Sequence, residues 1–405
     1  MLSVHNHDDD DDNDNDTISD RQSNLDQQVN KLLIDQAAQL IEAADILLIA
    51  TGAGFSADSG LPTYSDVAQN PIYQALGIDY GDLCRIQCLK ENPKLFYGFW
   101  GTCFNMYQRQ VQPHSGYQLL KTWCDEKQVR LDQRRKRQQQ QQQQQEQHTN
   151  GDSIDKPKSA YYLYTSNVDG HFRLAGFSNE WLHEVHGAID TWVPAIILDD
   201  NDSNDYDDAS ENKQQYPVPD SYSFPIDAET LLGPSPEALR ESIIPPKDNN
   251  DDMSMSSCRL RPRVLMFDDG FPSHTQMGLD TSCERYQAWE STMESAMEAS
   301  HCNTTSSDDD NGMKLVILEI GCGIRVPSVR IECQDVLCDT AGRCYQRSSS
   351  TSADDSRPSC SLIRINPDHE SIEHVPPNAT GVSIRGKALE TLQAIQERIN
   401  ILKKK

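Results

Sequence analysis

The sequence predicts an α/β protein built on a parallel β-sheet that is covered by helices on both faces. Short, almost wholly apolar runs alternate along the chain with amphipathic stretches of helical period, which is typical of parallel strands buried between helices. Several of these runs end directly in glycine or polar residues, and ligands of such sheets bind at the carboxyl ends of the strands. Hydrophobic residues are only 36% of the 405 residues, and the polar ones gather in blocks that interrupt the pattern.

The first predicted element is a helix over 27–44, where Leu33, Ala37, Leu40 and Ile41 recur at helical spacing. The apolar run 46–50 follows it at once and predicts a buried strand. Further strands are expected over 161–165, 264–267, 315–320, 362–366 and 381–384. Residues 386–402 predict an amphipathic helix that closes the fold.

Five polar, low-complexity segments cannot contribute to a core, and we expect them to be disordered. They are the acidic tail 1–25 and the inserts 128–158, 199–258, 301–312 and 345–358. The remainder of 26–400 is expected to form one domain that these inserts interrupt. The Arg-Arg-Lys-Arg run 134–137 precedes a glutamine tract and reads either as a nuclear import signal or as a solvated spacer.

The formal net charge of −27 argues against direct binding of nucleic acid or anionic membranes, because neutralising phosphates requires a basic surface. No apolar run approaches the roughly 20 residues of a membrane helix, and the N-terminus lacks the features of a signal peptide. We therefore expect a cytoplasmic or nuclear protein that is not secreted. Its 12 cysteines are then expected to be reduced thiols.

The segment after the first strand begins Thr51-Gly52-Ala53-Gly54-Phe55-Ser56. Its glycines permit a tight turn and close approach of the backbone to a phosphate, and a helix that follows would offer N–H groups to an anion. Plain packing glycines are an equal alternative. The third glycine of the usual dinucleotide fingerprint is missing, so an ordinary dehydrogenase is a poor match.

Polar residues also follow two later strands. Asn167 and Asp169 come just after 161–165 and could hold a planar carboxamide, although an Asx-rich turn explains them as well. His186 has a suitable pKa for a general base near neutrality, but an isolated histidine is more often a core or loop residue. Gly321 and Gly323 follow 315–320 and form either another approach to a ligand or a packing turn.

The order of the motifs is more specific than any one of them. GAGxSxxSGxP begins at Gly52, TxNxDG at Thr165, HG at His186, RPxVxxF at Arg261, GxG at Gly321 and IN at Ile365. This order resembles the sirtuin family over about residues 30–400. The stretches SNVDGxFxxAGF, RPxxLMFxD and EIGxGxxxPxVR are similar to a divergent, mostly microbial branch of that family.

The resemblance implies a Rossmann-like domain with a smaller module, NAD as co-substrate, and transfer of an acyl group from lysine to ADP-ribose with release of nicotinamide. It makes His186 the general base that deprotonates a ribose hydroxyl. By the same resemblance, the pyrophosphate would be held by Gly52, Ala53, Gly54 and Ser56, and a ribose would be covered by Tyr64. The nicotinamide carboxamide and its ribose would be bound by Asn167 and Asp169. The adenosine side would be lined by Gly321, Cys322, Gly323 and Asn366, and the acyl-lysine channel by Val264 and Phe267.

The sequence departs from the family at three places. Ser166 stands before Asn167 in place of a glutamine, a change shared with the divergent branch. Ser65 replaces an arginine of the first motif, for which Arg85 and Arg325 are possible substitutes. The family's two CxxC pairs are missing, since Cys258 is the only cysteine between Gly187 and Arg261, and one thiolate cannot build a tetrahedral Cys₄ site. We therefore predict no structural zinc and a reduced small module. A residual alternative is the cluster formed by Cys333, Cys338 and Cys344.

The leading hypothesis is thus an NAD-dependent protein-lysine deacylase (deacetylase) whose partner is an acyl-lysine protein or peptide. One alternative is a sirtuin-like protein ADP-ribosyltransferase or NAD hydrolase. A second alternative is a non-catalytic scaffold that binds NAD or ADP-ribose. Retention of His186 together with Asn167 and Asp169 argues against the scaffold, because a protein that only binds has no need of a base.

Overall fold

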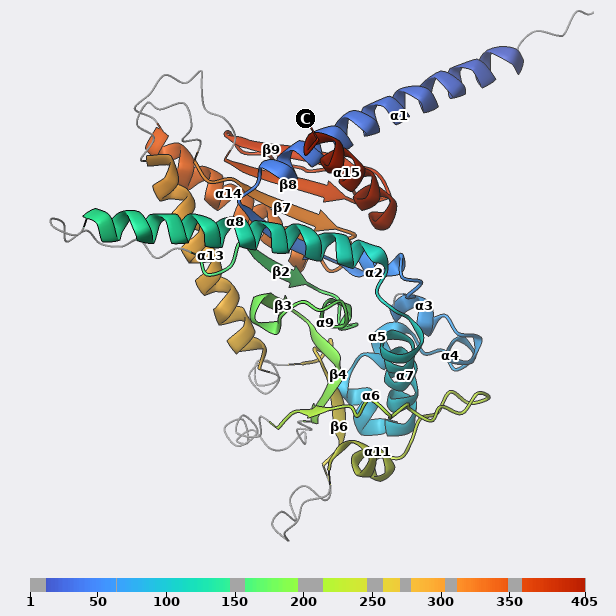
Figure 1. Ribbon diagram of the computed structural model, residues 1–405. Helices are drawn as coiled ribbons and strands as arrows, with labels where there is room; N and C mark the ends of the chain where they lie inside the picture. The colour runs from blue at the N-terminus through green and yellow to red at the C-terminus, as the bar shows by residue number, and fades with distance from the viewer. Residues whose placement is uncertain are drawn as a thin grey trace, which may run out of the picture.

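A computed structural model describes residues 12–62, 64–145, 157–195, 214–245, 258–269, 278–302, 312–348 and 359–404. Figure 1 shows a larger sheet flanked by long helices and a second, smaller sheet joined to it through β3 and β4. The strands are β1 (Ile46–Thr51), β2 (Tyr161–Thr165), β3 (Leu182–Glu184), β4 (Gly187–Pro194), β5 (Tyr216–Pro217), β6 (Leu260–Val264), β7 (Leu315–Ile320), β8 (Cys360–Ile365) and β9 (Ala379–Ile384).

The helices differ widely in length. The long ones are α1 (Asp12–Ala43), α8 (Ser115–Gln145), α13 (Leu279–Cys302), α14 (Ser328–Ser348), α15 (Ala388–Leu402) and α7 (Pro93–Asn105), which continues into the π-helical turn η1 (Met106–Gln110). The short ones are α2 (Ala53–Ala57), α3 (Tyr64–Ala68), α4 (Pro71–Ala75), α5 (Tyr80–Leu83), α6 (Ile86–Glu91), α9 (His171–Leu174), the 3₁₀ turn η2 (Asn179–Trp181) and α11 (Pro236–Ile243).

The larger sheet has six strands in the order β3-β2-β1-β7-β8-β9, and every pair in it is parallel. Counted in chain order within this sheet, the strands lie 3-2-1-4-5-6, which is the doubly wound order of the Rossmann fold. The order reverses between β1 and β7. Ligands of doubly wound sheets bind in the crevice outside the carboxyl ends of the strands, at such a reversal. A ligand site is therefore expected where β1 and β7 end.

The central strands of the sheet are buried on both faces because most of their residues are apolar. Leu47 and Ile49 of β1 pack into a core with α1, α8 and α15. Leu48 and Ala50, which point to the opposite face, pack into a second core with α13 and α14. The prediction of a parallel sheet covered by helices on both faces is confirmed.

A smaller module lies beside the larger sheet. Its three strands pair antiparallel in the order β5-β4-β6, and helices α5, α7 and α11 contribute to the same core. Trp192 of β4 is fully buried and contacts the rings of Tyr97 and Phe224 at 5.9 and 5.1 Å. Large aromatic side chains therefore fill the centre of this module.

Most predicted strands are confirmed within two residues, but the one expected over 264–267 is wrong. The strand is β6, which ends at Val264. Pro262 is tolerated in it because β6 is an edge strand of the small sheet. The chain then turns because the Asp269 carboxylate binds both the Arg261 guanidinium at 2.6 Å and the Met266 amide at 2.6 Å.

Parts of the segments that we expected to be disordered are ordered. Helix α1 begins inside the acidic tail 1–25, and α8 runs through the basic run to Gln145, since Arg, Lys and Gln are good helix formers. Arg130 and Arg134 of α8 bind Glu42 and Asp45 near the end of α1.

The insert 199–258 also contains an ordered part, residues 214–245, whose buried Phe224 belongs to the small core. Helices α13 and α14 reach Cys302 and Ser348, inside the segments 301–312 and 345–358. The rest of these segments lies mostly outside the described residues. No helix in the described ranges is long and apolar enough to cross a membrane.

Candidate functional site

The turns after β1 and β7 meet at the point where the strand order reverses. The Gly54 amide donates to the Gly321 carbonyl at 3.0 Å. A Cβ built on Gly52 would lie 2.8 Å from the Cα of Cys322, and one built on Gly54 would lie 2.8 Å from the Cα of Gly321. Real Cβ atoms do not approach backbone this closely, so both positions require glycine. Packing of one turn on the other is therefore sufficient to explain these two glycines.

Three of the predicted site residues lie together beside this junction. Ser56 Oγ donates to Asp169 Oδ2 at 2.5 Å, and the Asn167 side-chain amide donates to Ser56 Oγ at 2.9 Å and to the Gly52 carbonyl at 3.0 Å. All three side chains are buried. The polar residues after β1 and β2 thus form one hydrogen-bonded group at the carboxyl edge of the sheet.

The carboxylate of Asp169 is fixed from several directions. Its Oδ1 accepts from the His171 amide at 2.8 Å, while its main-chain carbonyl accepts from the Gln108 side chain. Tyr117 lies 3.0 Å from Ser56 Oγ, and burial, with the charge of Asp169, raises the pKa of this phenol well above its usual value. Tyr117 therefore stays a neutral hydroxyl beside the Asp169 carboxyl group.

His186 lies in the link between the two sheets. The Val185 amide donates to the Thr165 carbonyl at 2.9 Å, and the His186 carbonyl accepts from the Leu265 amide at 2.9 Å. Gly187 has φ +87°, and a Cβ there would lie 2.0 Å from the Arg263 carbonyl oxygen, so only glycine fits. Because β3 is parallel to β2, His186 leaves the sheet at the same edge as Asn167 and is half-buried there.

The neighbouring His183 has a different environment. Its ring is buried, its Nδ1 lies 2.8 Å from Ser282 Oγ, and it packs on Tyr164 at 5.2 Å. Burial, assisted by the charges of Arg285 and His186, lowers its pKa to about 4. His183 is thus a neutral core residue, whereas His186 keeps contact with solvent.

The residues expected on the adenosine side have structural partners of their own. Asn366 donates to the Cys322 carbonyl at 2.9 Å, and its Oδ1 accepts from the Asp368 and His369 amides at 3.0 Å each. It therefore ties the turn after β8 to the turn after β7. Burial raises the pKa of the Cys322 thiol well above its usual value, so this thiol is neutral. Gly323 is exposed, with open space around it.

The two residues expected in an acyl-lysine channel separate. Val264 is buried at the end of β6, where it pairs with Gly187. Phe267 is 55% exposed and contacts the ring of Tyr80 edge-on at 5.3 Å, so of the two it is the one that can meet a ligand from solvent. The side chains of Tyr64 and Ser65 lie outside the described residues.

Among the described residues of the small module, no set of ligands fits zinc. Across the described ranges, no group of three or more His, Cys, Asp or Glu side chains is arranged to hold a metal ion. Cys258 is half-buried, and Cys84 and Cys103 belong to the apolar core. The absence of structural zinc remains a prediction, which metal analysis can test.

An ion-pair network beside His186 was not foreseen from the sequence. Arg173 of α9 binds Glu184 and, at 2.7 Å, Asp190, and Arg263 of β6 lies 3.5 Å from Glu184. The one signal in the sequence that points to Glu184 is its position two residues before His186. Nothing in the sequence pattern shows that Arg173 contacts both carboxylates.

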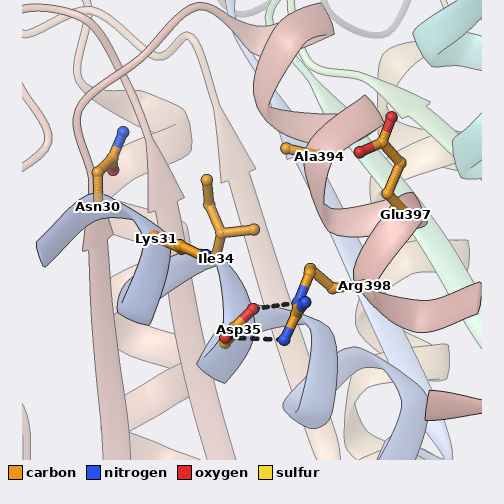
Figure 2. A pocket seen from close by; sticks show the side chains of 7 residues that line it. All are labelled: Asn30, Lys31, Ile34, Asp35, Ala394, Glu397 and Arg398. Atoms are coloured by element: carbon orange, nitrogen blue, oxygen red, sulfur yellow. Dashed lines mark hydrogen bonds and ion pairs between the residues drawn. The ribbon is translucent and has the colours of Figure 1, made fainter. Parts of the chain in front are cut away.

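A surface hollow lies away from this edge, between α1 and α15. Figure 2 shows the residues that line it, with Asp35 and Arg398 joined as an ion pair. The lining residues are Asn30, Lys31, Ile34, Asp35, Ala394, Glu397 and Arg398. None of the predicted site residues belongs to this group.

Fold and site together define a doubly wound α/β protein whose polar cluster lies at the reversal of strand order, next to the link with a second module. No family model and no curated protein sequence matches the chain. Among solved structures, it is similar to a Sir2 homologue in complex with NAD, at 16% identity and a TM-score of 0.44 over 91% of this chain and 94% of that chain.

Two further solved structures are similar to the chain at comparably low sequence identity. Sir2 bound to an acetylated peptide matches at 12% identity and a TM-score of 0.44, over 90% of this chain and 98% of that one. A structure described as the structural basis of sirtuin substrate affinity matches at 12% identity and a TM-score of 0.45, over 89% and 97%. Sequence identities and TM-scores this low do not establish a function, which therefore depends on the chain's own residues.

Proposed function

We propose that the chain is a sirtuin-type, NAD-dependent protein-lysine deacylase. The observation that carries this proposal is the hydrogen-bonded cluster of Ser56, Asn167 and Asp169 at the reversal of strand order, with His186 leaving the same edge of the sheet. A doubly wound sheet binds its ligand at this point. The polar groups there include a carboxylate, an amide, a hydroxyl and an imidazole, which suit a ribose and a carboxamide.

NAD fits some of these residues better than others. Asn167 Oδ1 and the Asp169 carboxylate are rigidly held acceptors for the N–H groups of the nicotinamide carboxamide and for its ribose hydroxyls, whereas the Asn167 side-chain nitrogen already donates to Gly52 and Ser56. The turn from Gly52 to Gly54 fits the pyrophosphate less specifically, because the Gly54 and Phe55 amides are already bonded to backbone carbonyls. We therefore assign the nicotinamide side to Asn167 and Asp169 and regard the Gly52 turn mainly as the scaffold that positions Ser56.

In NAD, a glycosidic bond joins the ribose to nicotinamide, which is a cationic leaving group. A weak nucleophile such as an amide oxygen can therefore displace nicotinamide from the ribose. The part of this chain is to orient the ribose and to remove a proton. Neutral imidazole at His186 would accept the proton of a ribose hydroxyl, so that this oxygen can bond to the acyl carbon; the acyl carbon–nitrogen bond then breaks and the lysine leaves as the free amine. A single positioned base of this kind typically contributes about 10²–10⁴-fold to the rate. Phe267, exposed beside Tyr80, is assigned to the mouth of the acyl-lysine channel.

The proposal is tested by following nicotinamide release from NAD with and without an acetyl-lysine peptide. Release that depends on the peptide, together with an acylated ADP-ribose product, supports a deacylase. Release without peptide, or label transferred from NAD to protein, indicates an NAD hydrolase or an ADP-ribosyltransferase instead. Binding of NAD without any release indicates a scaffold.

A further inference from the structure

The link that carries His186 is held at both of its ends by one side chain. Arg173 binds Glu184, two residues before His186, and Asp190, four residues after it. Its Nη2 lies 2.7 Å and its Nε 3.1 Å from Asp190 Oδ2, while Nη1 donates to Glu184 Oε2. Two separate carboxylates on β3 and β4 thus share a single planar guanidinium, whose fork of donors suits such bridging.

The same arginine is part of the loop that carries the polar cluster. Arg173 stands four residues after Asp169, in the short helix α9. A Cβ built on Gly170 would lie 2.8 Å from Arg173 Nη2, so the guanidinium lies directly against this loop. The Ile189 amide, from the far side of the link, donates to the Val168 carbonyl at 2.9 Å. The loop of Asn167 and Asp169 and the link of His186 are therefore held together by contacts before and after His186 in the chain.

The network is buried at its Glu184 end and partly exposed at Asp190. Glu184 is 8% exposed, and its second cationic neighbour, Arg263 of β6, lies 3.5 Å away. Burial raises the pKa of the Glu184 carboxyl, and the two guanidinium groups oppose that shift. Removing Arg173 leaves this buried carboxylate with Arg263 as its one cationic neighbour in the network, at 3.5 Å, which favours rearrangement of the link around it.

We propose that Arg173 is a positioning residue that sets the distance and orientation of His186 relative to Asn167 and Asp169, by holding Glu184 and Asp190 at the two ends of the link. Arg173 does not touch the reacting atoms and acts only through the segment 184–190. The proposal rests on the proposed function for its kinetic consequence, but the geometric claim about His186 stands on its own. A displacement of about 1 Å at a catalytic group can cost about 10²-fold in rate.

The variants to compare are Arg173→Met, Arg173→Lys and, as a matched control, Arg398→Met. Arg398 forms an ion pair with Asp35 between α15 and α1 (Figure 2), so its removal also breaks a partly buried pair but far from His186 in the fold. Two readouts are needed. The first is kcat and KM for NAD in the peptide-dependent assay. The second is the imidazole NMR signal of His186, assigned by its loss in His186→Gln.

Arg173→Met is expected to lower kcat about 10–100-fold while KM for NAD changes less than about threefold, and to shift or broaden the His186 signal. Arg173→Lys reaches one carboxylate at a time and is expected to recover part of kcat. Arg398→Met is expected to leave kcat and the His186 signal as in the wild type. If Arg173→Met does not fold, Asp190→Asn takes its place, because it removes one of the two carboxylates that Arg173 binds. It is expected to change kcat and the His186 signal in the same direction but by less.

The proposal is overturned if folded Arg173→Met, or Asp190→Asn in its place, matches Arg398→Met in both kcat and the His186 signal. A wild-type protein without any peptide-dependent turnover contradicts the proposed function instead. In that case the His186 signal alone decides whether Arg173 positions the imidazole.

Discussion

The ion pair between Arg261 and Asp269 offers the clearest quantitative prediction. Both side chains are buried, at 1% and 4% exposed, and they form two parallel bonds of 2.6 Å. Asp269 also accepts the Met266 amide at 2.6 Å, so it holds the turn that presents Phe267. We expect Asp269→Asn to destabilise the fold by about 3–5 kcal/mol, because a buried guanidinium is left without its counter-charge.

The adjacent residue provides a matched control for this prediction. Asp268 also accepts backbone amides, from Ile86 at 2.7 Å and Gln87 at 3.0 Å, but it is exposed and its contacts cap α6. Asp268→Asn keeps a capping oxygen, so its cost is expected to stay below about 1 kcal/mol. The double variant Arg261→Met with Asp269→Leu is expected to recover much of the loss, since well-packed apolar groups replace buried ion pairs at little net cost.

Urea denaturation followed by circular dichroism measures all three variants. The reasoning about burial is refuted if Asp269→Asn and Asp268→Asn cost the same, or if the double variant is as unstable as Asp269→Asn alone. A change in the slope of the free energy of unfolding with urea concentration would show that a variant had altered the denatured state or the cooperativity of unfolding.

The other predictions concern the site, the packing and the pH dependence. His186→Ala is expected to lower kcat at least about 10²-fold without loss of folded structure, and unchanged turnover contradicts its role as base. Gly54→Ala is expected to destabilise the protein by about 1–3 kcal/mol, because the added Cβ meets the backbone of Gly321; an unaffected melting temperature speaks against the close approach. Burial, with the charges of Glu332 and other carboxylates, raises the pKa of Glu290 to about 8 from 4.5. This group's contribution to stability is present in full below pH 4.5 and is lost as pH rises through 8. Glu290→Gln is therefore expected to be more stable than the wild type at pH 9 and equal to it at pH 4, in thermal melts at both values. Metal analysis of purified protein is expected to find no stoichiometric zinc, and one equivalent per chain contradicts this.

The larger sheet could be predicted because its central strands β1, β2 and β7 are apolar at most positions. The runs that became β1, β2 and β7 contrast sharply with their surroundings, so their bounds were close to those observed. β3 and β4 were missed because His183, Glu184 and Asp190 interrupt their apolar pattern. These polar side chains are satisfied by partners far away in sequence, such as Ser282 and Arg173, and a local pattern contains no information about such partners.

The polar inserts show what low hydrophobicity does not predict. Low hydrophobicity correctly marks residues that contribute little to a core, but it does not exclude helix. The end of α8 contains Arg, Lys and Gln, which extend a helix whose earlier turns are anchored by buried residues such as Tyr117 and Trp123. Within 214–245, widely spaced apolar residues, among them Phe224 and Leu239, reach the core of the small module one at a time. Neither arrangement has a period that a sequence pattern can detect.

The site was predicted as a set of separate motifs after strands, and the parallel sheet accounts for their meeting. Ser56, Asn167 and Asp169 lie together because β1 and β2 are adjacent and end at the same edge. Which of these contacts serve the fold and which await a ligand could not be read from the sequence. The packing of Gly52 against Cys322, for example, depends on the position of β7.

Calorimetric titration with NAD tests the central claim most directly. The wild type is expected to bind NAD, His186→Ala to bind it with similar affinity, and Asp169→Asn at least about tenfold more weakly, because loss of a charge-assisted hydrogen bond costs about 1.5–3 kcal/mol. Binding that is absent at millimolar NAD, or that is indifferent to Asp169→Asn, contradicts a nicotinamide nucleotide site at the edge where β1 and β2 end.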